Sequence, residues 1–181
     1  MPALICLLRG VNVGGHNTIK MDALRALCES LKLRKAQTYV QSGNVVFEAP
    51  AGDLAALARR IENGIEKGFG CRPDVVLRSL AEMRELVARN PFAGRADVEP
   101  NKLLVVFFGA EPDVDRVNAL KVNNEELHLV GRELYVYFPI GQGQSKLSFA
   151  PFDRGAGKVS WTGRNWNTVM KLLEMAASVE T

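Results

Sequence analysis

The segment from Leu7 to Asn17 carries the residue types that most directly suggest binding chemistry. Three of its residues are glycines, and it joins an expected strand to an expected helix. Glycines allow unusual backbone angles and leave N–H groups accessible, so such a loop can hold an anion with help from the helix dipole. The spacing matches neither G-x-G-x-x-G nor a phosphate loop ending in Gly-Lys-Ser/Thr. An anion site and a conformationally demanding loop without a ligand both stay open.

Three further segments combine glycine with amide, hydroxyl or basic side chains. Residues 39–45 suit a tight turn, residues 143–148 contain a Ser-Lys pair, and residues 162–172 place an arginine near an expected helix N-terminus. A turn, a helix cap and solvated cations would explain the same residues without a ligand. In the functional interpretation, the basic residues neutralise a small anion and the amides orient it. We therefore assign twelve residues to a candidate ligand site: Arg9, Asn12, Gly14, Gly15, Lys20, Gln41, Asn44, Ser145, Lys146, Arg164, Asn165 and Asn167.

Catalytic groups are scarce. The chain has two histidines, His16 in the glycine-rich loop and His128 in an alternating strand pattern, and neither has a partner that the sequence identifies. The close carboxylate pairs, Asp113 with Asp115 and Glu125 with Glu126, suit a helix cap and a polar turn. We therefore assign no catalytic residue, and whether the protein is an enzyme stays open. The cysteines, Cys6, Cys28 and Cys71, have no C-x-x-C spacing, so we expect reduced thiols and neither a metal nor a cofactor.

The composition is that of an ordinary globular protein. The 181 residues are 47% hydrophobic and 24% charged, with a formal net charge of +3. The longest apolar stretches, 103–108 and 134–140, are far shorter than the roughly 20 residues that span a bilayer. The N-terminus lacks a basic region, and Arg9 interrupts its apolar run, which argues against a signal peptide. We expect a cytoplasmic protein that does not enter a membrane.

The charge is divided unevenly along the chain. Residues 1–44 hold six basic and two acidic side chains, residues 45–140 hold twelve and fifteen, and residues 141–181 hold five and three. The two ends are therefore basic and the middle is acidic. These runs could be solvated faces, or the two ends could meet in one cationic site.

The apolar pattern predicts β-α-β-β-α-β followed by a helix, and then β-α-β-β-α. Asp53, Asp113 and the Ser79–Glu82 capping box mark helix starts, and either Thr162 or Asn165 caps the last helix. The expected strands are 3–8, 36–40, 44–49, 72–78, 102–108, 126–130 and 133–138, and the first helix is 21–33. The pattern predicts an α+β fold of two ferredoxin-like (split β-α-β) half-domains with antiparallel sheets, at 1–89 and 101–181, joined by a linker at 90–100.

Five motifs together resemble those of a known bacterial family. LLRGVNVGG, YVQSGNVVF, NPF, GQGQSKL and TGRNWNTVMKL occur in the order typical of domain-of-unknown-function family 1697, over essentially the whole chain. The resemblance implies a two-part α+β fold with ferredoxin-like halves, and it supplies no reaction. Gln144 stands where the family usually has arginine, which weakens a cation-dependent role for that loop. Residues 149–160 are also atypical, so no site is transferred to them.

Three kinds of function remain open. The first is binding, with or without turnover, of a small anionic or phosphorylated ligand at the twelve residues above. The second is a nucleic-acid-binding module, because Tyr135 and Tyr137 share one face of a strand and could stack on bases. The third is a structural or interaction protein, as a monomer or as a homodimer formed through a strand edge.

Overall fold

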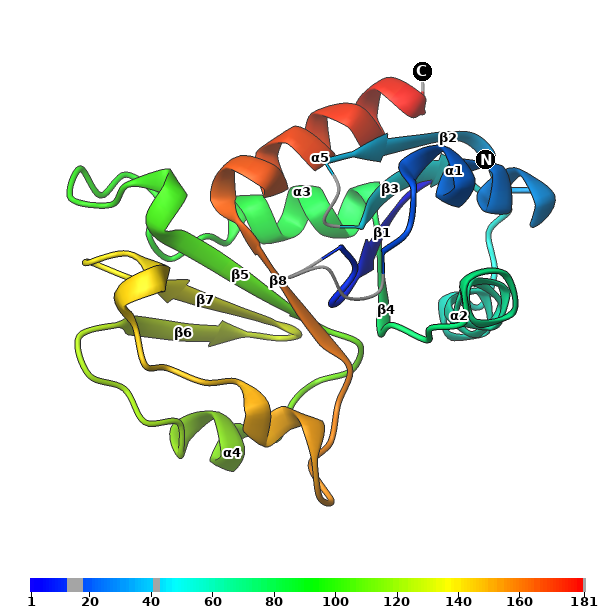
Figure 1. Cartoon of the computed structure of the whole chain (residues 1–181). Helices are drawn as coiled ribbons and strands as arrows, with labels where there is room; N and C mark the ends of the chain where they lie inside the picture. The colour runs from blue at the N-terminus through cyan, green and yellow to red at the C-terminus, as the bar shows by residue number, and fades with distance from the viewer. Residues whose placement is uncertain (13–17, 41–42, 181) are drawn as a thin grey trace. The chain divides into compact units, whose positions relative to one another are not determined.

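A computed structural model of the chain describes residues 1–12, 18–40 and 43–180 (Figure 1). Helices and strands are mixed, and the strands form two four-stranded antiparallel sheets, which confirms the predicted α+β class. The chain divides into two compact units, one made of residues 1–84 with 171–181 and the other of residues 85–170. The domain limits expected from the sequence, 1–89 and 101–181 with a linker at 90–100, stay a prediction.

The first unit has the strand order β2-β3-β1-β4, with β1 in the interior. Every residue of β1 is buried, which explains the continuous apolar run in its sequence. On one face of the sheet, Leu4, Cys6 and Leu8 join a core that includes Leu24 of α1 and Ile61 of α2. The elements of this sheet and its helices are β1 (Ala3–Leu8), α1 (Met21–Ser30), β2 (Arg34–Tyr39), β3 (Asn44–Glu48), α2 (Leu54–Phe69) and β4 (Val75–Ser79).

The second unit repeats this strand order as β6-β7-β5-β8, so β5 takes the place of β1. Two short 3₁₀ turns, Gln142–Gln144 and Ala150–Asp153, occupy the connection where the first unit has α2. Helices α3 (Leu80–Ala88) and α5 (Trp166–Val179) follow the last strand of each sheet, and the division between the units falls inside both helices. The remaining elements are β5 (Leu103–Phe108), α4 (Val114–Asn118), β6 (Glu126–Val130), β7 (Glu133–Tyr137) and β8 (Trp161–Asn165).

Strand β8 is absent from the sequence-based prediction. It pairs with β5 over five residues, and Thr162 and Arg164 are its buried positions. Polar side chains and a glycine give this segment no apolar alternation, so pairing with β5 determines its conformation. The proposal of Thr162 as a helix cap is therefore wrong. Asn165 caps α5 instead, because its Oδ1 accepts a hydrogen bond from Thr168 N at 2.9 Å.

The other helix starts agree with the sequence. Asp53 accepts hydrogen bonds from the first backbone N–H groups of α2, and Asp113 does so for α4. Ser79 and Glu82 form the reciprocal capping box that opens α3, at 2.9 and 3.1 Å. Helix α1 ends at Ser30 rather than at Leu33, and β4 begins at Val75 rather than at Arg72. Within the described ranges, no helix has the length and apolar character needed to cross a membrane.

Candidate functional site

Arg9 lies at the end of β1, next to the start of β4. Its backbone N–H donates to Asp74 O at 3.1 Å, and its guanidinium pairs with the Asp74 carboxylate at 3.3 Å. Both side chains are about one-third exposed, so the ion pair adds little to stability. Arg9 thus has an anionic partner within its own unit.

The side chain of Asn12 binds the backbone of Ile19, seven residues further along the chain. Its Nδ2 donates to Ile19 O at 2.9 Å, and its Oδ1 accepts from Ile19 N at 2.7 Å. Asn12 has a φ of 58°, a left-handed conformation that asparagine tolerates better than most residues. Lys20 follows directly, at the exposed N-cap position of α1, and its side chain does not cap the helix.

Asn44 lies at the turn between β2 and β3 and is fully buried. Its Nδ2 donates to Tyr39 O at 3.0 Å, so the side chain ties the two strands of the hairpin together. The backbone of the preceding glycine, Gly43, accepts from Leu8 N at 2.8 Å, which places the hairpin beside the end of β1. Arg9, Asn12, Lys20 and Asn44 therefore gather at one end of the first sheet. Gly14, Gly15, Gln41 and His16 lie outside the described residues.

Ser145 and Lys146 line a cavity of about 350 Å³ in the second unit. Lys121 and Glu125 come to the same cavity from the segment before β6, and Gln144, Asn123 and Asn124 add side-chain amides to its wall. Ser145 Oγ donates to Glu125 Oε1, and Leu147 N donates to Ser145 Oγ at 3.1 Å. The sequence does not identify Glu125 or Lys121 as site residues, because only packing of the 3₁₀ segment brings them to Ser145.

Hydrogen bonds in this cavity favour the ionised form of the Glu125 carboxylate. It is 8% exposed, and its second oxygen accepts from Asn123 N at 2.9 Å. The hydrogen bond from Ser145, with those from nearby backbone amides, lowers the pKa of Glu125 below its usual range despite the opposing effect of burial. Hydrogen bonds from Ser145 and Asn123 thus stabilise this carboxylate, and the cavity also has two exposed lysines on its wall.

Arg164 lies elsewhere in the same unit. It is 8% exposed in β8, where its guanidinium donates to Thr162 Oγ1 at 2.6 Å and to Gly163 O at 2.8 Å. Asn165 caps α5, and Asn167 is exposed on that helix. Strands β6 and β8 are opposite edges of the sheet, separated by two strands or about 14 Å. Within this unit, the structure therefore does not bring Arg164 together with the Ser145–Lys146 segment.

The two carboxylate pairs that the sequence indicates, Asp113 with Asp115 and Glu125 with Glu126, do not form an acid–base site. Asp113 caps α4, whereas Glu126 binds Arg95 Nη1 and His128 Nε2, both at 2.7 Å. The Arg95 and His128 contacts lower the pKa of Glu126, the opposite of what a general acid needs at neutral pH. Among the residues that the structure describes, no group of three His, Cys, Asp or Glu side chains could hold a metal ion.

The tyrosines proposed to stack on nucleic-acid bases are buried. Tyr135 is 0% exposed and its hydroxyl donates to Leu86 O at 2.6 Å, while Tyr137 is 6% exposed and its hydroxyl donates to Asp97 O at 3.0 Å. Neither ring is presented to solvent, so they do not supply the stacking surface that single-stranded RNA recognition requires.

Comparison with known proteins supports this fold. A solved structure described as that of conserved bacterial protein SP0830 from Streptococcus pneumoniae has 24% sequence identity and a TM-score of 0.77. The match covers 97% of this chain and 98% of the other, and it shows a shared fold. No curated protein matches the chain. The family model described as "Protein of unknown function (DUF1697)" matches residues 1–135. The chain therefore belongs to the DUF1697 family, as its motifs predict.

Proposed function

We propose that this protein binds a small anionic or phosphorylated ligand in the cavity lined by Ser145, Lys146, Lys121 and Glu125. The observation that carries the proposal is the presence of both lysines on the wall of one cavity of about 350 Å³. A cavity of this size is at the lower end of the range typical of small-molecule sites. Residues 145 and 146 also belong to the candidate site that the sequence indicates.

Charge supports an anion rather than a cation in this cavity. The two lysines exceed the single carboxylate of Glu125 by one positive charge, and Ser145 and Asn123 already donate to that carboxylate. The side-chain amides of Asn123, Asn124 and Gln144 can donate to ligand oxygens and fix their orientation. The wider site expected from the sequence stays a prediction; besides Ser145 and Lys146 it includes Arg9, Asn12, Gly14, Gly15, Lys20, Gln41, Asn44, Arg164, Asn165 and Asn167.

Calorimetric titration with inorganic phosphate and with a sugar monophosphate tests the proposal. We expect saturable binding that weakens at high salt, and a loss of about tenfold in affinity in Lys146→Gln and in Lys121→Gln. Lys158→Gln is the matched control, because Lys158 is an exposed lysine of the same unit outside this cavity. Equal affinities in the wild type and all three variants, or no binding of either probe, would overturn the proposal.

A further inference from the structure

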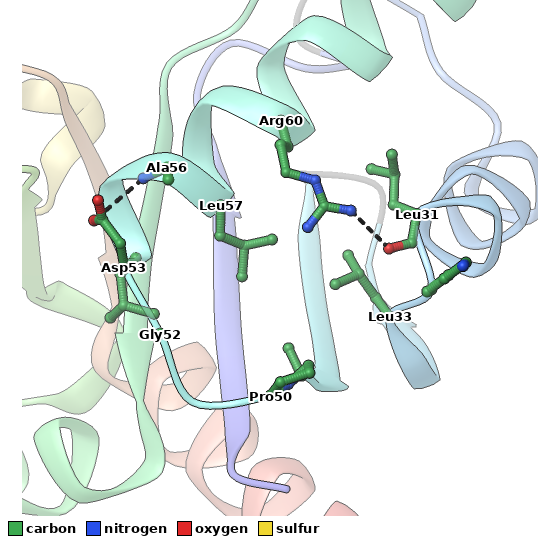
Figure 2. A pocket seen from close by; sticks show the side chains of 11 residues that line it. Leu31, Leu33, Pro50, Gly52, Asp53, Ala56, Leu57 and Arg60 are labelled. Atoms are coloured by element: carbon green, nitrogen blue, oxygen red, sulfur yellow. Dashed lines mark hydrogen bonds between the residues drawn. The ribbon is translucent and has the colours of Figure 1, made fainter.

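A second cavity of about 350 Å³ lies in the first unit and is chemically different (Figure 2). It is bounded by the connection between α1 and β2 on one side and by the first two turns of α2 on the other. Leu33, Pro50 and Leu57 face a common space, and Leu31 and Leu54 extend its apolar wall. We call it the Arg60 pocket, after one of the two basic residues that line it.

The Arg60 guanidinium is oriented by the backbone of the first helix. Its Nη2 donates to Leu31 O at 3.0 Å, at the C-cap residue of α1, where the helix dipole also favours a positive charge (Figure 2). An arginine has five N–H donors, so this bond leaves most of them for other acceptors. In the described part of the chain, no Asp or Glu forms an ion pair with Arg60. Lys32, on the same wall, adds a second positive charge.

Asp53 is the one acidic residue of the lining, and it faces the helix rather than Arg60. Its Oδ1 accepts from Ala55 N at 2.9 Å and from Ala56 N at 3.3 Å, so its charge is used in capping α2 (Figure 2). The pocket thus joins a mainly apolar wall to a net positive edge. A ligand that complements both parts has an apolar body and one anionic group.

We propose that the Arg60 pocket binds a small monocarboxylic acid with an apolar body, its carboxylate on Arg60 and its hydrocarbon part against Leu33, Leu54 and Leu57. Planar guanidinium groups bind carboxylates through two parallel hydrogen bonds, which favours a carboxylate over a single-point anion. Burial of the hydrocarbon part supplies the remaining affinity. This site is separate from the cavity of the proposed function, in the other unit, and does not depend on it.

Octanoate is a suitable probe, with binding measured by calorimetry and located by backbone amide NMR shifts. We expect saturable binding, shifts centred on residues 31–33 and 53–60, and about fourfold weaker binding for each methylene removed from the chain. Octanol, which lacks the carboxylate, is expected to bind at least tenfold more weakly. Octanoate that binds no better than octanol would overturn the role of Arg60.

Single substitutions test whether Arg60 itself contacts the carboxylate or whether any loss of a surface charge weakens binding equally. Arg60→Gln is expected to weaken octanoate binding at least tenfold, and Arg60→Lys to weaken it less. Arg59→Gln is the matched control, because Arg59 is the preceding exposed residue and lies outside the lining. Ala56→Trp fills the pocket and should abolish binding, whereas Lys146→Gln should leave it unchanged. Thermal unfolding of each variant confirms that it is folded. Unchanged binding in Arg60→Gln or Ala56→Trp would refute the proposal.

Discussion

The side-chain amide of Asn12 forms two hydrogen bonds with the backbone of a single residue, Ile19. The amide donates to one backbone group and accepts from the other, as a strand residue does across a β-ladder. This pair connects two points of the chain seven residues apart, directly before the N-cap of α1. The sequence indicates Asn12 as a ligand-orienting residue, and the structure assigns these two hydrogen bonds to its side chain.

Removing the Asn12 side chain should destabilise the fold measurably. Asn12→Ala deletes both hydrogen bonds and places alanine at a φ of 58°, so we expect urea denaturation to show a loss of about 2–3 kcal/mol in the free energy of unfolding. Asn12→Gly deletes the same bonds but accepts the backbone angle, and should lose about 1 kcal/mol less. A glycine variant as stable as the wild type would show that the bonds to Ile19 contribute nothing.

The contact between Glu125 and Ser145 predicts a specific pH dependence. Because the folded state lowers the pKa of Glu125, the stabilisation is present above the unfolded value of about 4.3 and is lost as the pH falls through the folded value. Denaturation at pH 7 should show Glu125→Gln to be about 1–2 kcal/mol less stable than the wild type. At pH 3 the difference should shrink.

Ser145→Ala provides the companion measurement for Glu125. It removes the donor that contributes most to the lowered pKa of this carboxyl, so it should reproduce the loss of stability at neutral pH. The double variant should lose less than the two single variants added together, because both remove the same contact. Strictly additive losses would contradict a direct coupling between the two side chains.

Gly43 should tolerate no side chain. Its φ is +81°, and an added Cβ would lie 2.8 Å from Leu8 Cβ, so Gly43→Ala combines an unfavourable backbone angle with a steric clash. We expect a loss of about 2–4 kcal/mol in the free energy of unfolding. Gly10→Ala has a similar φ, +70°, with open space around it, and should lose only about 1 kcal/mol. Equal losses in the two variants would show that contact of the added Cβ with Leu8 does not contribute to the loss of stability in Gly43→Ala.

The cysteines should differ in reactivity. Burial raises the pKa of the Cys28 thiol to about 11, so very little thiolate is present at pH 8. Cys28 is also 3% exposed, whereas Cys71 is partly exposed. Under native conditions, mass spectrometry after iodoacetamide treatment should find Cys71 modified well before Cys28. Comparable rates at both positions would mean that α1 opens readily.

Local signals in the sequence are sufficient for much of the fold. The continuous apolar runs of β1 and β5 predict strands buried on both faces, and both are interior in their sheets. Asp53, Asp113 and the Ser79–Glu82 pair predict helix starts, since a capping side chain binds backbone groups only two or three residues away. Such contacts depend on neighbouring residues alone, so the order of residues is enough to identify them.

The candidate sites depend on contacts that link distant parts of the chain. β8 exists because β5 pairs with it, and this places Arg164 at one edge of the sheet. Ser145 and Glu125 lie near the opposite edge, which β6 forms. Arg60 reaches Leu31 across 29 positions, and Ser145 reaches Glu125 across 20. The sequence by itself determined the family and the helices and strands with strong local signals, but not β8. Only the tertiary structure decided which polar side chains meet at a cavity, because the burial and charge of each group are set by residues far away in the chain.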